Sequence, residues 1–323
     1  MLKRGSSVFL AAALMVLCFF SVPVFAAEPE FDISDYTIED LQTMTTAEKK
    51  KLMEDFIETY NPYGIKDLME QESSVSGRFG VQPLWSSDSS ILGDGKQMAT
   101  HQLITLEALS VFIGDYGFYN IDATSALAVA LHLAVASGLP DIDETDSRSF
   151  KGHFYNPDTG FNLSLQTAPT AKTRVGEHYA RATERLRTNV NMDVTSADFL
   201  YVLEYLGRAL HYMQDACEPH HVSSQPAVLT SHLEFEAYVN EHIDTLLPNV
   251  TAISKGFYSQ ANNQTTQNLT HTAAVIAKLY ANDVGRLNIM QWDGIGAACL
   301  ENAVWHSARL IYKIFYDNGA TFI

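Results

Sequence analysis

The chain has 323 residues, a formal net charge of −17 at neutral pH and three cysteines. This length exceeds one typical domain, although processing can shorten the mature protein. The acidic residues are spread over the chain, which argues against nonspecific binding to nucleic-acid phosphates. We therefore expect no stable nucleic-acid partner.

Residues 1–26 have the features of a secretory signal peptide. Lys3 and Arg4 precede an apolar run that ends at Phe20, and Ala26 closes a small-residue pattern of the kind that signal peptidase cleaves. The apolar run is short for a membrane span, which disfavours an anchor. We therefore predict a secreted, extracellular protein.

Residues 27–84 differ in character from the chain that follows them. Thr45 and Glu48 form a capping-box pattern, which predicts one amphipathic helix ending near Tyr60. Serine and glycine residues near the end of the segment give it a flexible, cleavable composition. We predict a propeptide; the alternative is a small N-terminal subdomain that stays attached.

From Trp85 onward, apolar residues recur at helical spacing and no alternating strand pattern of any length is found. The sequence from Ser137 to Pro140 is expected to stop the second helix, and an acid-rich loop to Gly160 follows it. Residues 85–323 are therefore predicted to form one all-α domain. The predicted helices cover residues 101–112, 124–136, 171–187, 199–216, 231–246, 268–287 and 297–316.

Two cysteines remain once the signal peptide, which carries Cys18, is removed. Cys217 and Cys299 could pair in an exported protein, but a chain of this size does not depend on a disulfide for its fold. Because spacing alone does not establish connectivity, a disulfide and two buried thiols both stay open.

Two pairs of potential metal ligands stand close together in the sequence. His211 and Asp215 are four residues apart, as are His232 and Glu236, so each pair lies on one face of its helix and can bind one metal ion. Imidazole together with carboxylate suits zinc, and several carboxylates suit a catalytic site better than a closed structural one.

A turn between these pairs supplies a further ligand. Pro219 ends or bends the first helix, because proline has no N–H and restricts the residue before it. His220 or His221 therefore lies on a turn that can fold back toward the metal.

The other histidines carry weaker signals. His153 lies in a turn-rich loop where a histidine has no evident packing reason, whereas His101 has no local partner and its role is open from spacing alone. A histidine on an apolar helix is more often a core or surface residue, which is our interpretation of His132, His178, His242, His271 and His306.

Clustered zinc ions favour phosphodiester hydrolysis, because they polarise a phosphoryl oxygen and make water nucleophilic at neutral pH. A nearby aspartate can orient that water or accept its proton. Amide hydrolases use similar ligands, so the metal site alone does not choose the bond.

The motif His211-x-x-x-Asp215-x-x-x-Pro219-x-His221, followed by His232-x-x-x-Glu236, resembles that of the bacterial zinc-dependent phospholipase C family. This family includes phosphatidylcholine-preferring enzymes and the catalytic domain of clostridial alpha-toxins. The resemblance covers the whole region after the propeptide, since Asp141 and His153 are spaced like the family's Asp and His ligand loop and His101 takes the early ligand position.

Trp85-Ser-Ser-Asp88 is similar to the start of the mature chain in this family, where the free amino group and carbonyl of a Trp bind zinc. The resemblance implies that an activating protease frees Trp85. It also implies three zinc ions, held by Trp85 and His101; by Asp141, His153 and His211; and by His221, His232 and Glu236, with Asp215 bridging the first two.

The resemblance assigns further roles around the metals. Asp141 would be the general base or water-orienting group, while Asp88 and Phe150 would line the substrate pocket, Phe150 by cation–π contact with a choline group. Ile142 stands where the best-known members have Tyr, which leaves the head-group preference open.

We therefore expect a secreted, monomeric, all-α phospholipase C that cleaves the glycerol–phosphate bond of phospholipids at a membrane or micelle surface. It would release diacylglycerol and a phosphorylated head group. The alternatives are an S1/P1-type zinc nuclease acting on single-stranded nucleic acid and a non-catalytic zinc-scavenging or host-binding protein. Because the chain ends at Ile323 without room for the β-sandwich of the alpha-toxins, weak action on intact cells is expected.

Overall fold

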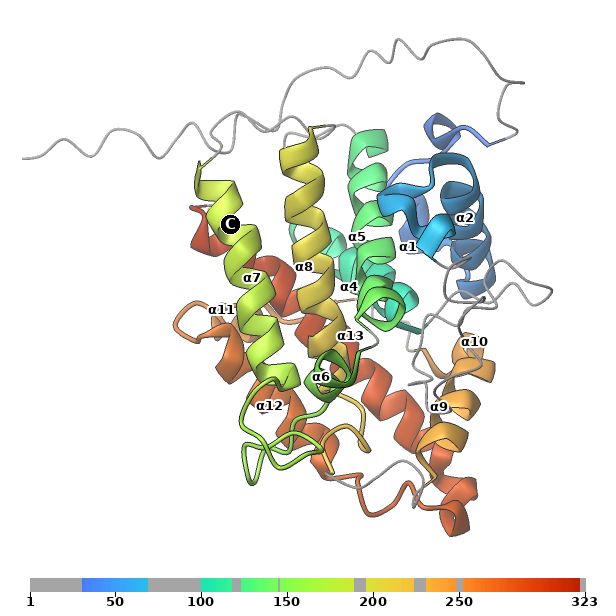
Figure 1. Ribbon diagram of the computed structural model, residues 1–323. Coiled ribbons are helices and arrows are strands. Elements are labelled where there is room, and N and C mark those ends of the chain that lie inside the picture. Colours follow the sequence, from blue (N-terminus) through green and yellow to red (C-terminus); the bar gives the residue numbers. More distant parts are fainter. Residues whose placement is uncertain are drawn as a thin grey trace, which may run out of the picture.

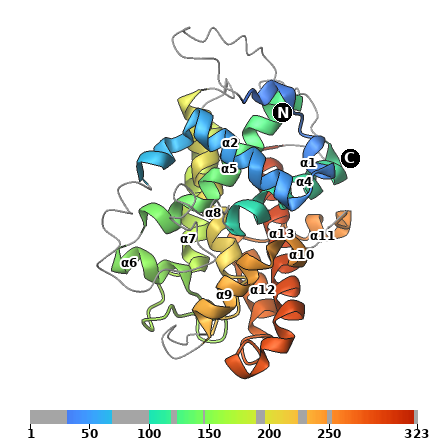
Figure 2. The ribbon, with the colours of Figure 1, turned by 90° about the vertical axis from the view of Figure 1, so that its right-hand side faces the viewer.

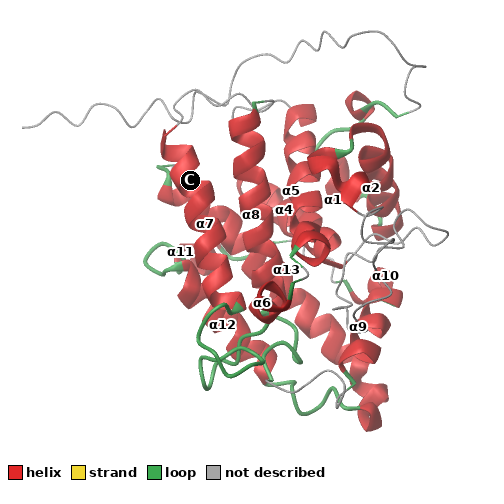
Figure 3. Cartoon of the chain, in the orientation of Figure 1, coloured by secondary structure: helices red, strands yellow, loops and turns green. Residues whose placement is uncertain are grey.

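The computed structural model describes residues 31–68, 100–117, 123–144, 146–188, 196–223, 231–247 and 252–319. Within these ranges every regular element is a helix (Figures 1 and 3), which confirms the predicted all-α fold class. The longer helices are α2 (Thr46–Tyr60), α4 (Thr100–Tyr116), α5 (Ala123–Asp143), α7 (Ala171–Thr188), α8 (Ala197–Asp215), α9 (His232–Glu241), α12 (Thr266–Lys278) and α13 (Trp292–Asp317).

Short helical segments connect the long ones. They are η1 (Ile33–Asp35), α1 (Asp40–Thr43), η2 (Pro62–Gly64), α6 (Ser147–Phe150), η4 (Lys151–His153), α10 (Ile243–Leu246), α11 (Lys255–Ser259) and η6 (Arg286–Gln291). The acid-rich stretch after residue 141, expected to be a loop, thus contains α6 and η4. The expected helix over 231–246 is divided between α9 and α10, and the one over 268–287 ends at Lys278.

Helix α8 lies between α5 and α7 (Figure 1), and the three helices pack side by side. Ser196 caps α8 by accepting a hydrogen bond from the N–H of Phe199, and buried side chains such as Leu203, Leu206 and Leu210 recur along it. These contacts place α8 among the buried helices of the fold. Its last turn carries His211 and Asp215 into the interior.

Gly207 allows α8 to approach α5 closely. A Cβ atom at this position would lie 2.4 Å from the Cβ of Ala136 and 2.9 Å from the carbonyl oxygen of Leu133. We expect Gly207→Ala to lower the free energy of unfolding by about 1–3 kcal/mol, because the helices must separate. Gly294→Ala is the matched control, since its Cβ meets nothing within 4 Å. Denaturant unfolding measures both, and equal stability of the two variants would contradict this packing.

Pro140 does not stop α5, contrary to the sequence-based expectation. The helix continues through this proline to Asp143. Pro140 has no N–H to donate to the carbonyl group of Ala136, four residues before it. Nδ1 of His211 donates to the carbonyl oxygen of Ser137 at 2.9 Å, which joins α5 to α8 here, and the continued helix carries Asp141 toward α8.

The segment before Trp85 is packed onto the rest of the protein as far as the structure describes it. Thr45 and Glu48 form the predicted capping box at the start of α2. Phe56 of α2 contacts His132 of α5 with ring centroids 5.2 Å apart, and Lys49 forms a buried 2.6 Å ion pair with Glu107 of α4. Figure 2 shows α1 and α2 beside α4 and α5.

Two further features concern the interior. By length and composition α5 is long and apolar enough to cross a membrane, but 72% of its apolar window is buried inside the protein, as in a core helix. Cys217 and Cys299 are free thiols and both are buried.

Candidate metal centre

Among the residues that the structure describes, buried histidines and acids from α4, α5, η4, α8, the turn after α8 and α9 meet near the C-terminal end of α8. They form three groups whose potential ligand atoms lie within 4.8 Å of one another. The first group is His101, His211 and Asp215; the second is Asp141, His153 and His211; the third is Glu218, His221, His232 and Glu236.

The first two groups share His211 and are in direct contact. Nε2 of His211 lies 3.0 Å from Nδ1 of His153 and 3.5 Å from Oδ1 of Asp141. Nε2 of His101 lies 3.6 Å from Oδ1 of Asp215 and 3.8 Å from Oδ2 of Asp141. Atoms that can donate lone pairs to a metal therefore converge on a small volume.

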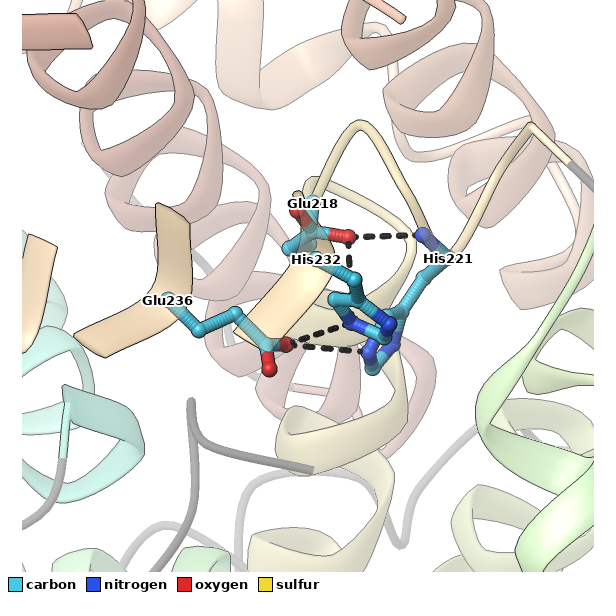
Figure 4. A group of neighbouring side chains, drawn as sticks. All are labelled: Glu218, His221, His232 and Glu236. Atoms are coloured by element: carbon cyan, nitrogen blue, oxygen red, sulfur yellow. Dashed lines mark hydrogen bonds and ion pairs between the residues drawn. The ribbon is translucent and has the colours of Figure 1, made fainter. Parts of the chain in front are cut away.

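The third group links α9 to the turn after α8 (Figure 4). Oε1 of Glu236 lies 2.9 Å from Nε2 of His232 and 3.2 Å from Nε2 of His221. The four-residue spacing of His232 and Glu236 gives this contact, since both residues face the same side of α9. Their side chains, like that of His221, are at most 1% exposed.

Asp215 contacts residues of all three groups. Its Oδ2 lies 2.9 Å from Nδ1 of His153 and 3.2 Å from Nε2 of His211. Its Oδ1 lies 3.2 Å from Nδ1 of His221 and 3.6 Å from Nε2 of His101. Asp215 is therefore the carboxylate that joins the groups.

Hydrogen bonds outside the groups orient two of the rings as metal ligands require. Nδ1 of His101 donates to Oε1 of Gln214 at 2.7 Å, and Nδ1 of His211 donates to the carbonyl oxygen of Ser137. In both rings the proton is held on Nδ1, which leaves Nε2 to face the carboxylates. This is the usual arrangement around a metal-binding histidine, so the residues fit a metal ion.

Burial and neighbouring charges set the protonation of the groups. Burial lowers the pKa of His101 to about 3, so its imidazole is neutral at pH 7. Burial also opposes a charged His211, but Asp215 and Asp141 outweigh it and raise its pKa to about 9. Burial favours protonation of Asp215, yet the adjacent His211 and His153 hold its pKa well below the usual range. The centre thus offers ionised carboxylates, and a metal ion would replace the proton on His211.

A salt-bridge network fixes the segment that follows Asp141. The guanidinium of Arg208, on α8, donates to Asp143 at 2.8 Å and to Glu144 at 3.0 Å. The hydroxyl of Tyr212 donates to Glu144 at 2.8 Å. These contacts hold the end of α5 against α8 and so position Asp141.

The structure brings together all the predicted metal ligands that it describes: His101, Asp141, His153, His211, Asp215, His221, His232 and Glu236. The predicted ligand Trp85 and pocket residue Asp88 lie outside the described residues. Phe150 is half-buried, with its ring centroid 6.2 Å from that of His153. Its place beside the centre is compatible with the predicted pocket role.

Sequence reasoning missed Glu218, which the structure places in the third group. Its position three residues before His221 was the available signal. Of the two histidines left open on the turn, His221 contributes to a group and His220 instead contacts Glu218. The histidines interpreted as core or surface residues, His132, His178, His242, His271 and His306, belong to none of the three groups among the described residues.

The helical fold and the adjoining histidine and carboxylate groups together define the class of this protein: an all-α protein with a potential multinuclear metal centre. No family model matches the chain. It is 25% identical over 252 residues to a phospholipase C of Paraclostridium bifermentans, covering 72% of this chain and 63% of that protein. A phospholipase C of Bacillus cereus is 27% identical over 147 residues, covering 46% of this chain and 48% of the relative.

The alpha-toxin of Clostridium absonum has a similar structure, with a TM-score of 0.60 and 21% identity over 71% of this chain and 66% of the toxin. These comparisons confirm the resemblance to the bacterial phospholipase C and alpha-toxin family, and the alpha-toxin fold is shared. The chain spans about three fifths of the length of the first curated relatives it matches.

Proposed function

We propose that the protein is a secreted zinc-dependent phospholipase C that releases diacylglycerol and a phosphorylated head group. The observation that carries this proposal is the contact of Asp215 with all three ligand groups, in a chain whose relatives are named phospholipase C. Residues 1–26, with their basic start and apolar run, support export as a signal peptide.

The proposed centre binds three zinc ions, one in each group, and Trp85 completes the first group. When bound, zinc polarises a phosphoryl oxygen and makes water nucleophilic at neutral pH. His101, His153 and His211 would hold the ions through neutral imidazole nitrogens. Asp141, 3.5 Å from His211 and buried at the end of α5, would orient the attacking water or accept its proton.

The same proposal gives residues 27–84 a role as a propeptide. While residue 84 is attached, the nitrogen of Trp85 is an amide and cannot serve as an amine ligand; after cleavage, an amine with a pKa of about 8 can bind a metal. The test is to compare zinc content and hydrolysis by the intact chain and by the chain cut before Trp85. Full activity and three zinc ions in the intact chain would exclude this role.

The head-group pocket is proposed from Phe150 and Asp88. An aromatic ring can hold a quaternary ammonium by cation–π contact, and a carboxylate adds charge complementarity. Ile142, buried beside Asp141, supplies no hydroxyl to this pocket. The preference between choline and ethanolamine is therefore a property to be measured.

An S1/P1-type nuclease is the competing function, because a similar metal centre also cleaves nucleic-acid phosphodiesters. The protein cut before Trp85 should be offered a phospholipid panel and single-stranded DNA in parallel, with and without a chelator. We expect chelator-sensitive release of phosphocholine or phosphoethanolamine and intact DNA. Nucleotide release with untouched lipid would instead establish the nuclease.

A further inference from the structure

Glu218 is a buried carboxylate in the third ligand group that the sequence motif does not account for. Its side chain is fully buried, and its Oε2 lies 3.9 Å from Nε2 of His232. Figure 4 shows the carboxylates of Glu218 and Glu236 beside the rings of His221 and His232. We propose that Glu218 is a fourth protein ligand of the metal ion in this group, an inference that rests on the proposed zinc centre.

The distances suit a tetrahedral ion. Ligand atoms at about 2.0–2.1 Å from a tetrahedral zinc lie roughly 3.4 Å from one another. The separations to Nε2 of His232 are 2.9 Å from Glu236 and 3.9 Å from Glu218, and that from Glu236 to Nε2 of His221 is 3.2 Å. These three values fall on both sides of the tetrahedral distance, and all four ligand atoms lie within 4.8 Å of one another, so side-chain shifts are needed to bring them onto one ion.

Charge balance gives a second reason. A divalent ion with two neutral imidazoles and one carboxylate keeps one positive charge, whereas a second carboxylate cancels it. Every member of this group is at most 1% exposed, so an uncompensated charge there would be costly. Glu218 and Glu236 together neutralise the ion.

Glu218 also stabilises the turn after α8, and the simpler explanation is that this is its whole role. Its Oε2 accepts a hydrogen bond from the backbone N–H of His221 at 2.6 Å, and its Oε1 lies 2.8 Å from Nδ1 of His220. Both contacts hold the turn after α8. Each carboxylate oxygen has a second lone pair, so these contacts leave Glu218 able to bind a metal ion as well.

Four protein ligands would leave no open position on this ion. The third ion would then join α9 to the turn after α8. Removing this ion should therefore reduce thermal stability as well as zinc content.

Glu218→Gln separates the two roles, because glutamine can accept from His221 and donate to His220 but carries no charge. The full chain is stripped with a chelator and dialysed at a series of buffered free-zinc concentrations, and bound zinc per chain is measured by elemental mass spectrometry. We expect affinity for one ion to fall at least about 10–100-fold, with a smaller zinc-dependent rise in Tm than in the wild type.

His220→Gln is the matched control, since it removes the other partner of Glu218 and should retain the zinc. Wild-type zinc affinity in Glu218→Gln would overturn the inference and leave Glu218 as a turn-holding residue. Equal losses in both variants would also overturn it, because Glu218 would then act through His220. Should Glu218→Gln fail to fold, Glu218→Asp keeps the charge but withdraws the carboxylate, and the same loss is expected. A wild-type chain without zinc would contradict the proposed function instead.

Discussion

Replacing Asp215 with asparagine is expected to lower phospholipid hydrolysis by about 10³-fold and to reduce bound zinc. Asp215 contacts His153, His211 and His221 at 2.9–3.2 Å, so one substitution removes the charge that joins all three groups. Metal-based stabilisation of the reacting phosphate supplies several kcal/mol, and each 1.4 kcal/mol changes the rate about tenfold. Initial rates and elemental analysis of the same preparation test this expectation.

Asp198→Asn is the matched control for this experiment. Asp198 lies on the same helix, but its side chain is 38% exposed and pairs with Arg185 away from the centre. We expect wild-type activity and zinc content in this variant. Asp215→Asn with near wild-type hydrolysis would show that the three groups are not the active centre.

Cutting the chain between residues 68 and 85 is expected to leave residues 31–68 bound to the rest of the protein. The segment buries a row of apolar side chains and forms the buried ion pair between Lys49 and Glu107. Removing one partner of such a pair costs about 3–5 kcal/mol, since the other charge stays buried. The apolar side chains that this segment buries are those of Ile38, Leu41, Leu52, Met53, Phe56, Ile57 and Ile65.

Size-exclusion chromatography of the cut protein tests this expectation directly, because the fragment should elute together with the rest of the protein. In the intact chain, Phe56→Ala should lower the free energy of unfolding by about 3–5 kcal/mol. Lys51→Ala is the control on the same helix; its side chain is 74% exposed, and a change of about 0.5 kcal/mol or less is expected. A fragment that separates and leaves a stable, active protein would contradict the packing role.

The fold class and the ligand pairs of α8 and α9 could be predicted from local spacing, whereas His101 and Asp141 were assigned only by the resemblance to the phospholipase C family. Apolar periodicity predicted α4, α7 and α8, and Thr45 with Glu48 predicted the start of α2. The four-residue spacing of His211 and Asp215 placed both ligands on one face of α8, where the structure has them in contact.

The rest required the three-dimensional structure. Pro140 is a strong helix breaker in a local interpretation, yet α5 continues through it to Asp143 and contacts α8, as between Ser137 and His211. Glu218 stands on an irregular turn, where no periodicity predicts the direction of a side chain. The packing of residues 31–68 depends on contacts such as Lys49 with Glu107, which are 58 residues apart.

The most direct test of the proposed zinc phospholipase C is a zinc titration of the protein cut before Trp85. The protein is stripped with a chelator, zinc is added stepwise, and the products released from dispersed phosphatidylcholine and phosphatidylethanolamine are measured by mass spectrometry. We predict no hydrolysis without zinc, and release of diacylglycerol with phosphocholine or phosphoethanolamine that rises with zinc until the centre is filled. Full hydrolysis by the stripped protein, or none at any zinc concentration, would contradict the proposed function.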